Sequence, residues 1–199
     1  MKLSKRGEYA LRSLINLGFA VEANRELVQA SELAESEQLP VKFLEQILQT
    51  LKEAGFVKSV RGKFGGYRLA KPARQIKIGQ VVRLIDGPLA PIACVSQSAY
   101  EKCTCPDEVH CGLRMLMLDV RNAIADILDR YSLADVVEIS LRKMRRDGVP
   151  LPFSAEADSA EPVMRVPARI ARQLARRSAK IRLSPTEGVL HQLLGDYTI

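Results

Sequence analysis

The sequence predicts a mainly α-helical protein with one short β-hairpin. Apolar residues recur at intervals of three and four in several segments, as they do along one face of an amphipathic helix. Two β-rich runs, 56–61 and 67–70, flank the glycine-rich turn 62–66 and predict the hairpin. A long apolar stripe within residues 113–131 predicts a further helix, which needs a packing partner.

Three helices are expected before the hairpin. Residues 4–22 form a core helix and residues 29–36 a second, short one. Pro40 then begins a helix that runs to Ala54, with Gly55 as its C-terminal cap. The apolar stripes of the first and third helices consist of Ala10, Leu14, Leu17 and Val21 and of Leu44, Ile47, Leu48 and Leu51, respectively.

The order helix, helix, turn, helix, hairpin is that of a winged helix-turn-helix domain. With a further short helix at 78–85, we assign residues 1–90 to such a DNA-binding domain. Its third helix is the candidate for the major groove, and the hairpin, or wing, can approach a phosphate or the minor groove. The expected DNA contacts are Lys42, Gln46 and Gln49 on the helix and Arg61, Lys63 and Arg68 on the wing.

The distribution of charge agrees with DNA as a partner. Residues 1–93 carry 15 Lys and Arg against 9 Asp and Glu, and residues 162–199 carry 7 against 2. Such an excess suits a polyanion, because Lys and Arg that neutralise phosphates release condensed counterions. The turn 62–66 lacks the Gly-Lys-Ser/Thr ending of a phosphate-binding loop, so the sequence does not predict an ATPase.

Four cysteines, Cys94, Cys103, Cys105 and Cys111, lie within 18 residues, and the other 181 residues contain none. We assign residues 91–111, which have no sustained periodicity, to a cysteine-rich loop. The spacing differs from the paired Cys-x2-Cys pattern of zinc sites, whereas thiolates on a loop suit an iron–sulphur cluster of the 2Fe–2S or 4Fe–4S type. A thiol switch, zinc or inert thiols remain alternatives.

An enzyme is not expected. The loop has one neighbouring histidine and no recognisable base, orienting acid or oxyanion site, so nucleophilic catalysis finds no support. A redox enzyme that carries a cluster is the remaining alternative of this class, but the sequence has no second cofactor motif.

Residues 112–146 are expected to form two dimerisation helices. Because the winged domain already supplies its own core, the long apolar stripe should pair with its copy in a second subunit and give a homodimer. Ser132 and Asp135 predict a capping box that begins the last helix, which ends near Arg146. The expected dimer seam consists of Leu116, Val120, Ile124 and Ile127.

Several segments resemble the Rrf2 family of winged-helix transcription regulators: residues 44–48, 55–62 and 65–69, and the cysteine loop ahead of a long helix. The likeness extends over about residues 1–140. It implies a homodimeric repressor or activator that binds a double-stranded DNA operator, and repression is the role that we expect. A cluster near the dimerisation helix would sense iron–sulphur status, iron, nitric oxide or redox state.

The same resemblance implies roles for single residues. Cys94, Cys105 and Cys111 correspond to three cluster ligands, and Cys103 is an additional thiol that can replace or join Cys105. Glu8 stands where some members have an acidic ligand from the partner subunit. Glu45 corresponds to a recognition-helix glutamate where loss of the cluster can change which operators are bound.

Residues 147–199 lie outside the resemblance. Prolines and scattered acidic residues predict a linker, and a run of Arg and Lys within 165–182 predicts a basic C-terminal extension, expected to be flexible. The sequence has no signal-peptide core and no uninterrupted apolar run long enough to span a bilayer. We therefore expect a cytoplasmic protein with no membrane partner.

Overall fold

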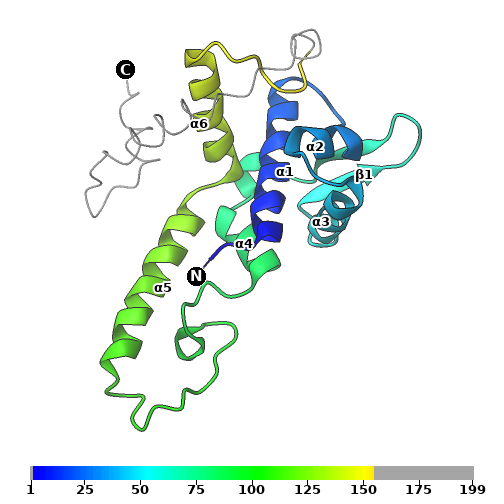
Figure 1. The fold of residues 1–199 in the computed structure, drawn as a ribbon. Coiled ribbons are helices and arrows are strands. Elements are labelled where there is room, and N and C mark those ends of the chain that lie inside the picture. Colours follow the sequence, from blue (N-terminus) through cyan, green and yellow to red (C-terminus); the bar gives the residue numbers. More distant parts are fainter. Residues whose placement is uncertain (1, 155–199) are drawn as a thin grey trace.

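The computed structural model describes residues 2–154, and Figure 1 shows its mainly helical arrangement with one hairpin. This confirms the predicted fold class. Along the chain the elements are α1 (Lys5–Glu22), α2 (Ala30–Glu37), α3 (Val41–Glu53), β1 (Val57–Val60), β2 (Gly66–Leu69), η1 (Ala73–Gln75), α4 (Ile78–Asp86), η2 (Ala93–Val95), α5 (Gly112–Arg130) and α6 (Leu133–Arg146).

Helix α1 is the centre of the core. Ser4 caps its N-terminus by accepting a hydrogen bond from the Gly7 amide at 3.0 Å. Its stripe is buried as predicted at Ala10, Leu14 and Leu17, but the inclusion of Val21 was wrong, because 54% of this residue is exposed. The last turn of α1 borders an open groove, so no element covers Val21.

The third helix is oriented by its apolar ridge. Leu44, Ile47, Leu48 and Leu51 are fully buried in the same core as α1. Beyond the helix, Gly55 has a φ of 73°, and the Phe56 amide donates to the Leu51 carbonyl at 2.9 Å. This left-handed turn ends the helix where the sequence predicted its cap, although Pro40 stands just before the first turn rather than in it.

The wing is a two-stranded antiparallel hairpin that is fixed to the helical part by a third segment. Val57 pairs with Leu69 and Val60 with Gly66. Val28, just before α2, exchanges two backbone hydrogen bonds with Tyr67, at 3.0 and 2.8 Å. A Cβ on Gly66 would lie 2.6 Å from the Val28 carbonyl oxygen, so glycine permits this close approach.

Helices α4 and α6 pack against α1 at two glycines. A Cβ on Gly7 would lie 2.5 Å from the Asp86 carboxylate at the end of α4, and one on Gly18 would lie 2.5 Å from Val137 of α6. Helix α6 begins with the predicted capping box of Ser132 and Asp135. Its apolar side chains Leu133, Val137 and Leu141 are buried in the same core as α1. Of the two helices expected in residues 112–146 to form the dimer, α6 therefore packs within its own chain.

The other helix of that segment, α5, projects away from the core and meets the loop from α4 at its far end (Figure 1). Ile124, Ala125 and Leu128 pack against the cluster around α4. Arg83 of α4 donates two hydrogen bonds to the Asp129 carboxylate, at 2.6 and 2.7 Å. The C-terminal half of α5 is therefore fixed to α4.

Of the linker and basic extension predicted for residues 147–199, only residues 147–154 lie within the described part of the chain. The prediction for the rest falls outside it. Among the described helices, none combines the length and the apolar character needed to cross a membrane.

Candidate nucleic-acid interface and cysteine site

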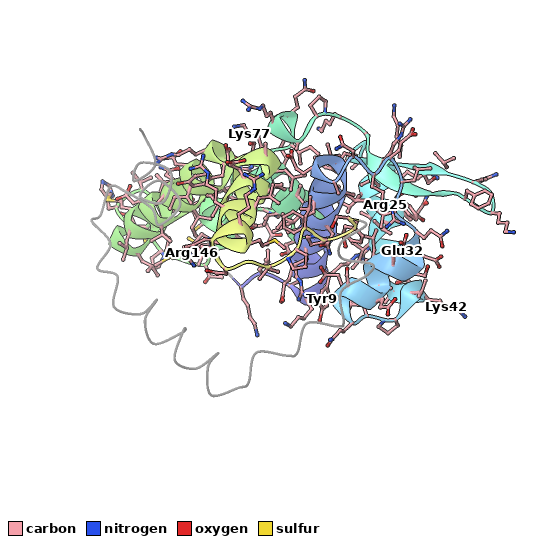
Figure 2. All side chains as sticks on the ribbon, turned by 90° about the horizontal axis from the view of Figure 1, so that it is seen from above. Tyr9, Arg25, Glu32, Lys42, Lys77 and Arg146 are labelled. Carbon is pink, nitrogen blue, oxygen red and sulfur yellow. The ribbon has the colours of Figure 1, made fainter. Side chains whose placement is uncertain are left out.

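The polar face of α3 points to solvent. Burial of the apolar ridge fixes the rotation of the helix about its axis, so the opposite face is presented outward. Figure 2 shows Lys42 extending from the molecule beside α2 and α3. All four residues predicted on this face are exposed: Lys42, Glu45, Gln46 and Gln49.

Two of these side chains already have neighbours. The Gln49 amide donates to the Glu53 carboxylate one turn later, at 2.7 Å. Burial raises the pKa of the Tyr67 hydroxyl, and the charge of Glu45 raises it further, which places Glu45 near the base of the wing. Glu45 of α3 therefore acts electrostatically on Tyr67 of β2.

A buried carboxylate in the turn before α3 attaches the helix-turn-helix to α1. Glu37 accepts a hydrogen bond from the Asn16 amide at 2.6 Å and forms an ion pair with Arg12 at 2.5 Å. Burial raises the pKa of Glu37, and Arg12 and Asn16 oppose this shift. Gln38 follows in the left-handed conformation, with a φ of 54°, and turns the chain toward α3.

The wing tip carries unpaired cations and an aromatic side chain. Arg61 and Lys63 are exposed, and neither forms an ion pair with another described residue. Phe64 is 84% exposed, with the Lys63 ammonium 5.7 Å from its ring centre. Phe64 is not among the predicted DNA contacts, although an aromatic residue within a glycine-rich turn was a usable signal in the sequence.

Arg68 differs from the other two predicted wing residues. It lies on β2 rather than at the tip, and its guanidinium donates to the Glu26 carboxylate at 2.9 Å. Both side chains are largely exposed, so this ion pair can exchange for a phosphate at little cost.

The cysteines lie in the long loop between α4 and α5, away from the wing (Figure 1). Cys94 is buried on η2, Cys103 and Cys105 are half-buried, and Cys111 is the N-terminal cap residue of α5. All four are free thiols and line one cavity of about 260 Å³. The fold therefore gathers the four sulphur groups at one place.

The four thiols lie close enough in this cavity to affect one another's ionisation. The interaction with Cys105 lowers the pKa of Cys103, and the same interaction raises the pKa of Cys105 to about 11. Burial raises the pKa of Cys94, and the neighbouring Cys103 adds to this effect. The ionisation of Cys94, Cys103 and Cys105 is therefore linked.

This donor set fits an iron–sulphur cluster in its chemistry and its shared cavity. It is not pre-arranged for a metal, because within residues 2–154 no three His, Cys, Asp or Glu side chains are placed to hold one. Glu8 is not among the cavity residues, and it pairs with Lys5 at 2.7 Å and Arg12 at 3.6 Å. A single chain therefore brings the cysteines together without Glu8.

The sequence model of the Rrf2 family, described as iron-dependent transcriptional regulators, matches residues 3–139. The chain belongs to this family. It is 40% identical over 139 residues to an rrf2-like HTH-type transcriptional regulator of Rhodobacter capsulatus, which covers 68% of the chain and 91% of that relative. This chain is accordingly a transcription regulator rather than an enzyme, with a winged-helix fold.

Solved structures of the family agree with the fold. CymR (YrzC), the global cysteine regulator of Bacillus subtilis, superimposes with a TM-score of 0.58 at 29% identity and covers 69% of this chain and 97% of its own. IscR of T. potens gives a TM-score of 0.52 at 27% identity and covers 81% of this chain and 94% of its own. Both neighbours are Rrf2-type regulators, so the mainly helical winged fold of this regulator is that of its family.

The buried Glu37 leads to a prediction about stability and pH. Since its pKa is raised in the folded state, the native protein keeps this proton longer than the unfolded chain, and stability falls as pH rises from the ordinary glutamate value, about 4.3, toward the folded pKa. Glu37→Gln should remove this fall while keeping the bond from Asn16. Glu37→Ala should lose about 1–3 kcal/mol at all pH values, because Asn16 keeps only its bond to the Ser36 hydroxyl and Arg12 loses its carboxylate partner.

Urea unfolding of the parent and both variants between pH 4 and pH 7 measures this. A parent and a Glu37→Gln variant whose free energies of unfolding change in parallel over that range would contradict the assignment.

Proposed function

We propose that this regulator is a homodimeric repressor whose operator binding is controlled by an iron–sulphur cluster that senses iron, redox state or nitric oxide. The single observation that carries this proposal is the cavity at the start of α5, which is lined by all four cysteines of the sequence. We further assign residues 1–90 to DNA binding, residues 91–111 to the cluster and residues 112–146 to the dimer, where α5 provides the subunit contact and α6 is packed in the core of α1.

In the proposed DNA complex, α3 enters the major groove and the wing approaches the backbone or the minor groove. The exposed amides of Gln46 and Gln49 suit adenine edges, and Lys42 suits a phosphate. Arg61 and Lys63 are available because they have no ion-pair partner among the described residues. Phe64 at the wing tip can insert between bases of a widened minor groove.

For the cluster, we propose Cys94, Cys105 and Cys111 as ligands, with Cys103 as an exchangeable neighbour of Cys105. When bound, the cluster supplies a redox-active and nitric-oxide-reactive group. The residues of this chain would hold it between η2 and the first turn of α5, because Cys94 and Cys111 lie at these two places. Glu8 can complete the set only from the second subunit, after release from Lys5 and Arg12.

The proposed dimer forms along the outer face of α5. Leu113, Leu116, Val120 and Ile127 are between 36% and 58% exposed, and their spacing of three, four and seven residues places them on one stripe. Ile124, which the sequence placed in the seam, is half-buried against the α4 cluster within one chain. We therefore retain Leu116, Val120 and Ile127 in the seam and assign Ile124 a supporting contact.

A specific observation also supports a second candidate, a thiol switch without iron. Cys103 and Cys105 line the same cavity, and each shifts the pKa of the other. A peroxide could oxidise this pair to a disulfide; the two thiols would give up two protons and two electrons, and the peroxide would be reduced to water or an alcohol and water. Zinc is the remaining alternative at the same site.

Mutations in α3 and in the wing should affect DNA binding differently. Gln46→Ala should cost about 1–3 kcal/mol of operator binding and relax the preference at one base pair, because a base contact is lost. Arg61→Ala should weaken binding to all sequences and lower the salt slope by about one, because a phosphate contact is lost. Fluorescence anisotropy over a salt series measures both, with Gln80→Ala and Arg74→Ala, exposed elsewhere in the domain, as matched controls. Parent-like binding by both test variants would refute the assignment.

The cluster is tested by strictly anaerobic purification followed by visible absorption, iron and sulphide analysis. The parent should be coloured, with iron and sulphide in equal amounts. Cys94→Ser and Cys111→Ser should lose the colour, whereas Cys103→Ser should keep it and serve as the matched control. Colourless, iron-free parent protein would eliminate the cluster, and about one zinc per subunit would favour the zinc alternative.

The dimer is tested by Val120→Glu combined with Ile127→Glu. Burying each aliphatic side chain contributes about 1.5–3 kcal/mol, so two charges on each facing helix should prevent association. Sedimentation should then find a folded monomer with most of its operator affinity lost, because a single winged module holds only a half-site. Asn122→Glu, at an exposed position of α5 outside the stripe, is the control. A double variant that remains a dimer places the subunit contact elsewhere.

A further inference from the structure

Arg121 is a buried charge without a partner. It projects from the middle of α5 and is only 9% exposed, so it is the one buried residue that α5 contributes. Its Nε has no hydrogen-bond partner, and the guanidinium forms no ion pair with another described residue. A guanidinium remains charged under all physiological conditions, so it cannot relieve this burial by losing a proton.

The guanidinium faces a small cavity between α4, α5 and the segment that leads to the cysteines. The cavity has a volume of about 100 Å³, which corresponds to roughly three water molecules at about 30 Å³ each. No Asp or Glu lies on its described walls, which are formed by Arg83, Pro88, Leu89, Ala90, Ser96, Gln97, Ser98, Arg121 and Ala125.

The other polar groups of the cavity can also donate hydrogen bonds. Ser96 is buried, and its hydroxyl oxygen accepts from the Ala99 amide at 3.0 Å, which leaves its own proton free to donate. Ser98 and Gln97 supply a further hydroxyl and an amide. Arg83 is neutralised by its two hydrogen bonds to Asp129, so the net charge at the cavity is that of Arg121.

We propose that this cavity is a binding site for a small oxyanion, either a tetrahedral anion such as sulfate or phosphate or a short carboxylate. The planar fork of an arginine matches both geometries, and a buried cation surrounded by donors and lacking acids selects negative charge. The volume admits an ion of a few heavy atoms and excludes a nucleotide.

The site has a consequence for the regulator, because its walls come from three segments. Arg121 belongs to α5, Leu89 follows α4, and Ser96 lies two residues after Cys94. A bound anion joins these segments around one charge. The anion therefore holds the segment that carries Cys94 against α5.

The test is thermal unfolding of the full-length protein in increasing sulfate, phosphate or acetate, each compared with chloride at equal ionic strength. The melting temperature of the parent should rise with oxyanion concentration and reach a plateau, and chloride should not produce this rise. The reason is that a ligand that binds only the native state stabilises it by mass action. The ion that acts at the lowest concentration identifies the preferred geometry. Equal shifts in every salt, chloride included, would refute the site.

Arg121→Met removes the charge and keeps the length of the side chain. In chloride this variant should melt above the parent, since an unpaired buried charge is replaced by an apolar group, and it should no longer respond to oxyanions. Arg130→Met, an exposed arginine on the same helix, is the matched control and should respond like the parent. An Arg121→Met variant that melts below the parent and sediments as a monomer would overturn the proposal, because the guanidinium would then serve the subunit interface.

Ser96→Ala keeps the proposal testable if Arg121→Met does not fold. It leaves the charge in place and removes one donor, so the dissociation constant for the oxyanion in isothermal titration calorimetry should rise about tenfold or more. Unchanged affinity together with a normal fold would exclude Ser96 from the site and contradict the proposed cavity.

Discussion

The structure depends on the close approach of α1 to its neighbours. Helix α1 has no side chain at Gly7 and Gly18, where α4 and α6 come nearest, and a Cβ at either position would be 2.5 Å from a neighbouring atom. Between these glycines, Ala10, Leu14 and Leu17 are buried against the ridge of α3. One helix thus sets the position of the recognition helix and of the helices that follow the wing. Because protein interiors are close-packed, a change in side-chain volume on α1 should displace α3, α4 and α6.

The two candidate sites lie apart in the structure. Helix α3 and the wing lie on one side, and the cysteine loop lies at the far end of α5 (Figure 1). Helix α4 connects them, because it contacts α1 near Gly7 and is fixed to α5 by Arg83 and Asp129. Any movement of α5 relative to α4 must therefore strain a bidentate ion pair.

The sequence was sufficient to predict those helices and strands that hydrophobic periodicity and turn residues determine. The ridge of α3, the hairpin and the capping box of α6 could all be read from local patterns, since a one-sided core selects one face of each element. Local patterns could not reveal that α6 returns to the core of α1, or that α4 divides the apolar stripe of α5 into a covered and an open side. These are tertiary contacts between distant segments, and for the same reason Ile124 was grouped with Val120.

The candidate site was predictable in its chemistry and less so in its arrangement. The clustering of the cysteines indicated sulphur ligands, but only the fold places Cys94 and Cys111 on one cavity. The burial of Arg121 could not be predicted from the sequence, because an arginine within an amphipathic helix is indistinguishable from a solvated charge until its neighbours are known. Phe64 could have been noted in the sequence as an aromatic residue within a glycine-rich turn, but its exposure at the hairpin tip became apparent only from the fold.

The position of Cys111 couples sulphur chemistry to helix stability. It is the N-terminal cap residue of α5, its side chain makes no capping hydrogen bond, and no acidic residue occupies the first turn. A negative charge on this sulphur interacts favourably with the positive end of the helix dipole, by about 0.3–1 kcal/mol. Neutralising the sulphur removes this favourable interaction at the end of the helix that carries Leu113. The charge on one sulphur atom thereby contributes to the stability of the first turn of α5.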